Sequence, residues 1–223
     1  MAQQLVLQDP SAVADVLTFA RRAARLSDPA VRLRAASGTL ALSAAPLSAR
    51  GFGDDAPTIL AMRFVGCDPE LVCDLVVDAG ALTAGEGAGV RLPDSGVSAA
   101  WAGISPPRAG WVPGGSVTSA QLSDVARTGI AAVADALPAS AGEDIVRSIR
   151  AAVWGAPSPE LGGIASGAAF AADALGFLAG GSAEVARVFR IGTWTRLSMI
   201  RGQVLVRAGN PTGLTTVRQT GDR

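Results

Sequence analysis

Histidine, lysine and tyrosine do not occur in this sequence of 223 residues, so all 19 of its basic side chains are arginine. Histidine is the usual base for serine and cysteine nucleophiles, and a Ser–His–Asp or Cys–His site within this chain is therefore excluded. The absence of lysine excludes a Walker A lysine, a Schiff base and an attachment point for pyridoxal phosphate. Catalysis would have to rest on carboxylates, arginines, thiols or backbone groups, and we therefore expect a protein that is not an enzyme.

Cysteine is nearly absent as well, with only Cys67 and Cys73 in the chain. Two cysteines are too few for a disulfide framework, and without histidine they cannot complete a tetrahedral zinc site. Free cysteine is among the most buried residue types. We expect two reduced, largely inaccessible thiols, and neither a metal nor another cofactor.

Excess charge of either sign is also lacking, because 19 acidic residues balance the arginines. No global field therefore draws the chain to nucleic acid, which makes nucleic acid an unfavoured partner without excluding a local basic patch. The first ten residues do not have the pattern of a secretory signal. The most membrane-like stretch, residues 163–181, contains Asp173, which is costly at a bilayer centre. We expect a cytoplasmic protein that does not enter a membrane.

The first half of the chain has the pattern of one helix followed by antiparallel strands. Asp9 and Pro10 are typical of a helix start, and apolar residues follow at helical spacing. Period-two alternation begins at Val31 and predicts strands to about residue 42, at 58–66, at 71–79 and at 90–101. Half-buried strands of this kind are typical of an antiparallel sheet.

Residues 103–118 are rich in proline and glycine and mark the sharpest change in composition. Helical periodicity follows at 122–137, 142–154 and 160–179, and alternation returns at 193–199 and 203–207. The sequence thus predicts an α+β protein: an N-terminal helix plus a mostly antiparallel sheet, then a helical region closed by a short β-hairpin. We place the two regions at residues 1–115 and 116–215, and whether they are separate domains stays open.

Two glycine patterns resemble functional motifs without meeting their requirements. Gly85, Gly87 and Gly89 follow a strand, but the dinucleotide fingerprint needs a helix next, so a hairpin turn is favoured. Gly163 and Gly167 form G-x-x-x-G, which in this context predicts close packing of a helix in the core.

Paired carboxylates are the remaining route to acid–base chemistry. Asp74 and Asp78 lie on one predicted strand, four residues and roughly 13 Å apart. That distance is too great for them to act as a pair.

Charge is asymmetric only at the C-terminus, where the last 41 residues hold seven arginines against two acidic residues, a local net charge of +5. A basic hairpin carrying a tryptophan could contact an acidic protein patch or nucleic acid phosphates, or could simply be a solvated sheet face. The candidate binding residues are Arg190, Trp194, Arg196, Arg201 and Arg207. We expect the arginines on the face opposite Leu197, Met199 and Leu205.

Three segments of the second half, residues 167–178, 194–198 and 201–207, together resemble an uncharacterised family of actinobacterial hypothetical proteins. The abundance of alanine, glycine and arginine fits that resemblance. It implies no activity, cofactor or site residue.

The function that best fits these patterns is a non-enzymatic binding or scaffolding protein that acts through protein–protein contacts, with a protein partner or a second copy of the chain. The alternative is a small-molecule or nucleotide-binding protein, which could include an enzyme that uses carboxylate and arginine side chains. A deep pocket with convergent Asp and Arg would favour the alternative, and a large flat apolar patch would favour the first.

Overall fold

A computed structural model describes residues 3–49, 54–178 and 184–209 of the chain. The α-helices are α1 (Pro10–Ala23), α2 (Ser119–Ala136), α3 (Glu143–Gly155) and α4 (Gly167–Ala174), with three short 3₁₀ helices at Ala79–Ala81, Ala100–Gly103 and Pro159–Leu161. The strands are β1 (Gln4–Val6), β2 (Ala30–Ala36), β3 (Thr39–Leu47), β4 (Thr58–Gly66), β5 (Cys73–Asp78), β6 (Thr83–Ala84), β7 (Gly89–Arg91), β8 (Val112–Thr118), β9 (Pro157–Ser158), β10 (Ile164–Ala165), β11 (Val185–Ile191), β12 (Trp194–Met199) and β13 (Gly202–Arg207). The α+β class predicted from the sequence is confirmed.

One eight-stranded antiparallel sheet organises the molecule, in the order β5-β2-β3-β4-β13-β12-β11-β8. Each half of the chain supplies a helix followed by a three-stranded meander: α1 precedes β2, β3 and β4, and α4 precedes β11, β12 and β13. The last strands of the two meanders, β4 and β13, pair antiparallel at the centre of the sheet. The two halves therefore share one continuous sheet.

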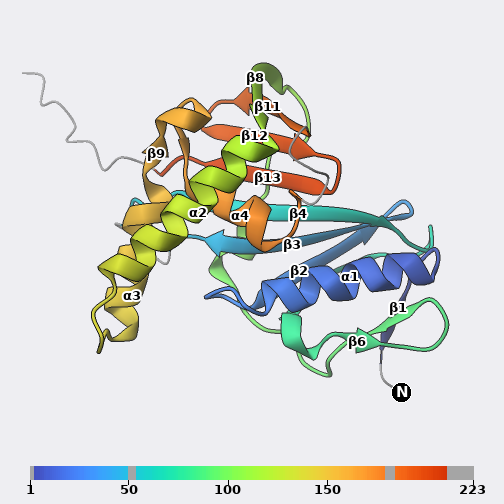
Figure 1. Cartoon of the computed structure of the whole chain (residues 1–223). Coiled ribbons are helices and arrows are strands. Elements are labelled where there is room, and N and C mark those ends of the chain that lie inside the picture. Colours follow the sequence, from blue (N-terminus) through green and yellow to red (C-terminus); the bar gives the residue numbers. More distant parts are fainter. Residues whose placement is uncertain (1–2, 50–53, 179–183, 210–223) are drawn as a thin grey trace, which may run out of the picture.

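Helices α1, α2 and α4 lie on the same side of this sheet, which we call the helical face (Figure 1). The main core lies between them and the sheet, and it includes Val16 and Phe19 of α1, Ala168 and Ala172 of α4 and Leu197 of β12. Small alanines on α4 allow that helix to approach the strands closely. The helical face is thus the side on which most apolar burial occurs.

Helix starts agree with their sequence signals. The side chain of Asp9 accepts a hydrogen bond from the backbone amide of Ala12, with Pro10 at the first helical position of α1. Thr118 and Gln121 form a capping box at the start of α2. The β12–β13 hairpin is confirmed, and residues 83–91 form the predicted hairpin turn between β6 and β7.

The structure differs from the sequence prediction in four places. The strand predicted at 90–101 is limited to β7, and Trp101 lies in a 3₁₀ turn. The proline- and glycine-rich segment ends in strand β8, which is an edge strand and so tolerates proline. The helix predicted at 160–179 is only α4, and Gly163, with φ of 83°, lies in a turn before it. Strand β11 was not predicted, although its last residues alternate.

The opposite side of the sheet, which we call the outer face, is crossed by the segment that joins β7 to β8, and no α-helix of the described residues covers it. We call residues 92–111 the connector. Trp101 in this segment is 2% exposed and packs with Leu60 and Leu205 of the outer face in a second, smaller apolar cluster. A connector that covers part of the outer face leaves a groove beside it.

Candidate functional site

The groove lies between the connector and the outer face of the sheet and has a volume of about 610 Å³. We call it the connector groove. Its floor comes from β3, β4 and β13, its two sides from β2 and β12, and its roof from the connector. The floor residues are Ala41, Ser43, Leu60, Met62, Phe64, Gln203 and Leu205. A volume of this size is within the range of ligand-binding sites, about 300–1,000 Å³.

Strand register explains why these side chains meet. Leu60 of β4 pairs with Leu205 of β13, and Leu205 pairs with Arg196 of β12, so the three side chains form one row across the outer face. A second row joins Met62 to Gln203 in the same way. Alternation along β4 places Leu60, Met62 and Phe64 on the same face because they are two residues apart. The floor is therefore mainly apolar and bordered by charge.

The connector is fixed to the sheet by hydrogen bonds from indole and guanidinium groups. The Trp101 indole donates to the carboxylate of Asp28 at 3.0 Å, in the segment just before β2. The Trp111 indole donates to the carbonyl of Pro107 at 3.0 Å and so closes a turn within the connector. The roof of the groove is consequently held by specific bonds as well as by apolar contact.

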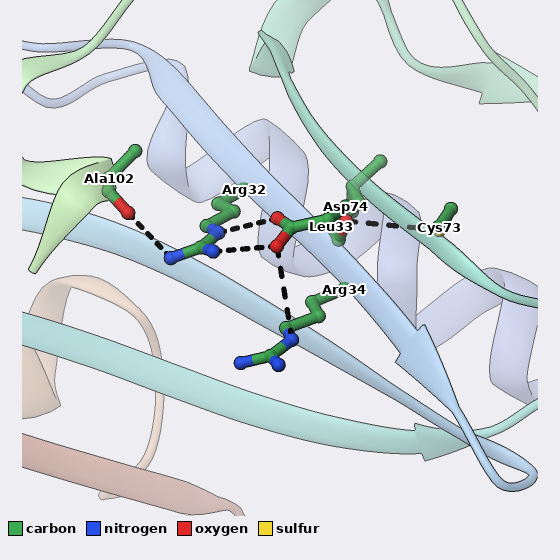
Figure 2. A network of polar contacts seen from close by, with 6 residues as sticks. All are labelled: Arg32, Leu33, Arg34, Cys73, Asp74 and Ala102. Carbon is green, nitrogen blue, oxygen red and sulfur yellow. Dashed lines mark hydrogen bonds and ion pairs between the residues drawn. The ribbon is translucent and has the colours of Figure 1, made fainter. Parts of the chain in front are cut away.

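Arg32 joins three parts of the molecule (Figure 2). Its guanidinium donates two hydrogen bonds to the carboxylate of Asp74 on β5, each 2.7 Å long, and a third to the carbonyl of Ala102 in the connector. The bidentate pair with Arg32 holds the pKa of Asp74 below its usual value and raises the pKa of Arg32. Arg34 lies 3.9 Å from the same carboxylate, with a side chain that is 45% exposed. Arg32 is thus committed to structure, whereas Arg34 remains accessible in the groove.

Arg196 stands at the opposite side of the groove between two aromatic rings. Its guanidinium carbon lies 4.6 Å from the ring centroids of both Trp111 and Phe189. Its Nε is buried, and no described residue accepts a hydrogen bond from it. Desolvation lowers the pKa of Arg196, but an arginine remains charged at neutral pH. A stacked guanidinium with unused donors is an unusual feature that a bound anion would satisfy.

The balance of charge in the groove is one-sided. Four arginines, Arg32, Arg34, Arg108 and Arg196, are among the described residues that line it, and no acidic residue is. Arg108 lies in the connector, is exposed, and forms no hydrogen bond or ion pair with another described residue. Asp74 neutralises one of these charges from β5, the strand beside β2. The site is positive although the whole chain is neutral.

The candidate residues from the sequence are separated by the structure. Arg196, Trp194 and Arg207 face the outer side, but only Arg196 lines the groove. Trp194 is 8% exposed and lines a separate hollow with Arg190, whose guanidinium donates to Thr195 and to the Gly162 carbonyl.

Arg201 lies in the turn between β12 and β13, where its carbonyl accepts a hydrogen bond from Arg63. The expected partition of faces holds for Leu197 and Met199, which are in the main core. It is wrong for Leu205, which belongs to the outer-face cluster because it is directly paired with Arg196.

Most of the groove was not found from the sequence. Its residues come from five strands and the connector, and no spacing in the chain brings them together. One signal was present: β4 is apolar at almost every position, which indicates a strand covered on both faces. The side chains available to cover its second face were Trp111, within the proline- and glycine-rich segment, and Trp101, just before that segment.

Other chemistry-bearing groups lie elsewhere. Cys67 and Cys73 are free thiols; Cys67 is buried and Cys73 partly buried, and burial raises the pKa of both. In the described part of the chain, no three or more cysteines and acidic residues gather closely enough to hold a metal ion. The same residues include no helix with the length and apolar character needed to cross a membrane.

Two family models match the chain, one for each half of the sheet. Residues 1–103 match "Domain of unknown function (DUF8010)", and residues 106–211 match "Domain of unknown function (DUF8185)". The two matches meet within the connector. At this coarse level they agree with the resemblance to uncharacterised proteins that the sequence indicated. Comparison with curated proteins gave no match.

Solved structures of similar fold are bacterial sliding clamps. A protein from Eubacterium rectale, named as a DNA polymerase III beta subunit, has a TM-score of 0.54 at 9% identity, over 95% of this chain and 66% of that one. The DnaN sliding clamp of Bartonella birtlesii, bound to griselimycin, has a TM-score of 0.50 at 10% identity, over 96% and 67%. The chain thus spans about two thirds of the length of each clamp. At such identities the likeness shows the fold alone.

Proposed function

We propose that this chain is a non-enzymatic binding or scaffolding protein that holds a segment of a protein partner in the connector groove. The observation that carries this proposal is the composition of the groove: an apolar floor bordered by arginines and roofed by tryptophan side chains. Aromatic residues and arginine are enriched in protein interfaces and among the residues that dominate binding energy. The groove therefore has the composition of a contact site.

The absence of a carboxylate in the groove separates this proposal from the enzymatic alternative. Acid–base catalysis by a chain without histidine, lysine or tyrosine rests mainly on carboxylates or thiols beside the reacting groups, and neither cysteine lines the groove. None of the described lining residues is acidic. Asp74 is held by Arg32 as a hydrogen-bond acceptor, with its pKa lowered, which makes it a poor proton donor. The clamp-like fold is compatible with binding and adds no chemistry of its own.

Photo-crosslinking in the host tests the proposal. We would place p-benzoylphenylalanine at Phe64, which lines the groove and is 45% exposed, and separately at Gln203 on the floor. The matched control is Val72, an apolar side chain that is 80% exposed and lies outside the groove. We expect positions 64 and 203 to crosslink to the same protein and position 72 to give no such product.

Filling the groove provides the second half of the test. Ala41→Trp adds bulk to the floor without removing a side-chain contact, and it should abolish the crosslinks from positions 64 and 203 while the protein remains folded. Crosslinks that persist in this variant would contradict the proposal. So would native mass spectra in which a small molecule, and no protein, accompanies the unaltered chain and is absent from Ala41→Trp.

A further inference from the structure

We infer that the partner segment is an extended acidic peptide that places an apolar side chain on the groove floor and a carboxylate against Arg196. This inference rests on the proposed function and specifies the chemistry of its partner. It follows from three features of the groove: the unsatisfied guanidinium of Arg196, the arginines on the opposite side, and the apolar floor between them.

Arg196 is prepared to receive an anion. Trp111 and Phe189 fix the plane of the guanidinium by stacking, so little side-chain freedom remains to be lost on binding. Its buried Nε has no acceptor among the described residues, and a buried unpaired donor is costly. The terminal nitrogens of Arg196 are not among the buried unpaired atoms and form no hydrogen bond or ion pair with a described residue, so a partner carboxylate can reach them and pair in the planar geometry that arginine prefers. The aromatic contacts would remain in place.

The opposite side of the groove offers a second anion-binding position. Arg34 is only loosely paired with Asp74, and Arg108 of the connector has no ion-pair partner among the described residues. The strands from β2 to β12 are separated by four spacings of about 4.8 Å, so Arg34 and Arg196 stand on strands about 19 Å apart. An extended chain covers that span in about six residues. Acidic residues toward both ends, with an apolar residue between them, would match this spacing.

The same features argue for protein over nucleic acid. Leu60, Met62 and Leu205 make most of the floor aliphatic, and Phe64 is the one aromatic side chain among the described floor residues, whereas single-stranded nucleic acid is bound on several accessible aromatic faces. Trp101 is buried, and the Trp111 ring is stacked on Arg196. An acidic peptide needs only the local charge that is present.

Selection from a random peptide library tests the inference. Phage-displayed eight-residue peptides would be selected on the full chain and depleted on Ala41→Trp, so that only groove binders remain. We expect the selected peptides to contain two or more Asp or Glu residues around a large apolar residue. Selected peptides that are neutral or basic would overturn the inference, as would a selection that enriches nothing.

Affinity measurements with the strongest synthetic peptide then test the role of Arg196. Fluorescence anisotropy should show binding weakened about thirtyfold by Arg196→Gln, the loss expected for a hydrogen bond to a charged group. The matched control is Arg207→Gln, which removes an exposed arginine on the same face outside the groove and should change affinity less than about twofold. Equal losses in the two variants would overturn the inference.

A second variant and a competition experiment separate loss of binding from unfolding and protein from nucleic acid. If Arg196→Gln unfolds the chain, the double variant Arg34→Gln with Arg108→Gln alters only accessible side chains and should still weaken binding about tenfold. A twelve-nucleotide oligothymidylate that displaces the peptide and binds more tightly than the peptide does would overturn the inference in favour of nucleic acid. Crosslinks to a protein from positions 64 and 203, together with failure of the acidic peptides, would leave the proposed function standing and reject only the acidic partner.

Discussion

Arg32 and Asp74 connect the edge strand, its neighbour and the connector at the scale of single residues. The sequence placed Asp74 on a strand and excluded it from paired carboxylate chemistry. It could not show that the partner of this carboxylate would be Arg32, because the pair depends on the register between β2 and β5. The pair holds the roof of the groove through Ala102.

Asp74→Asn should therefore destabilise the protein in a pH-dependent way. Arg32 lowers the pKa of Asp74 in the folded chain, so the pair stabilises above the unfolded-state pKa and this contribution is lost as the pH falls through the folded-state pKa. At pH 7 we expect a deficit in unfolding free energy of about 1 kcal/mol, because both side chains are partly exposed. In urea titrations the deficit should begin to shrink only below about pH 4. A deficit that is equal at pH 7 and pH 3 would contradict this.

The two thiols provide a second residue-level prediction. Burial raises the pKa of both Cys67 and Cys73, so both remain protonated and slow to react at neutral pH. Cys67 is 5% exposed and Cys73 only partly buried, which refines the expectation that both are inaccessible. With Ellman's reagent, Cys73 should react before Cys67, and both rates should rise as the pH increases above neutrality. Rapid labelling of Cys67 in the folded protein at pH 7 would exclude this account.

Secondary structure elements were predictable where local signals act alone. Asp9 with Pro10 fixes the start of α1, and period-two alternation identified β2, β4, β12 and β13. Elements were missed where tertiary context overrides local pattern. Strand β8 contains Pro113 and two glycines and forms only because β11 supplies its single neighbour at the sheet edge. Residues 160–166 were assigned to a helix, yet they form the end of a 3₁₀ helix, a turn and the short strand β10.

The packing of α4 gives a prediction at the scale of elements. A Cβ on Gly167 would lie 2.5 Å from Ile59 Cδ1 and 2.8 Å from the carbonyl oxygen of Trp154. Gly167→Ala should therefore cost about 1–3 kcal/mol of unfolding free energy by overpacking. Gly103→Ala is the control, because a Cβ there meets nothing within 4 Å. Equal stability of the two variants in urea would show that α4 does not approach the sheet this closely. The predicted role of Gly167 in core packing would then fail.

The groove is assembled from both halves of the chain and exists only in the whole molecule. Its floor combines β3, β4 and β13, near residues 41, 62 and 205. Its roof comes from the connector, where the two family matches meet. No local pattern encodes that assembly, because it depends on the antiparallel pairing of β4 with β13. Arg196 was identified as a candidate from the sequence, but the apolar pattern of β4, which indicates a strand covered on both faces, was not used. Only the order of strands in the sheet shows that Arg196 and β4 lie at the same groove.

The four tryptophans offer the most direct measurement of the central claim, that the connector groove is the binding site. Trp101 and Trp111 border the groove, Trp154 packs between α2 and α4 on the helical face, and Trp194 lies in a separate hollow. Their indole N–H signals in a ¹H–¹⁵N spectrum, assigned by single Trp→Phe variants, would report which surface a partner segment contacts. Titration with the crosslinked partner segment should shift the Trp111 signal most, shift Trp101 as well, and leave Trp154 unchanged. A shift of Trp154 with Trp111 unmoved would place binding on the helical face and contradict the account.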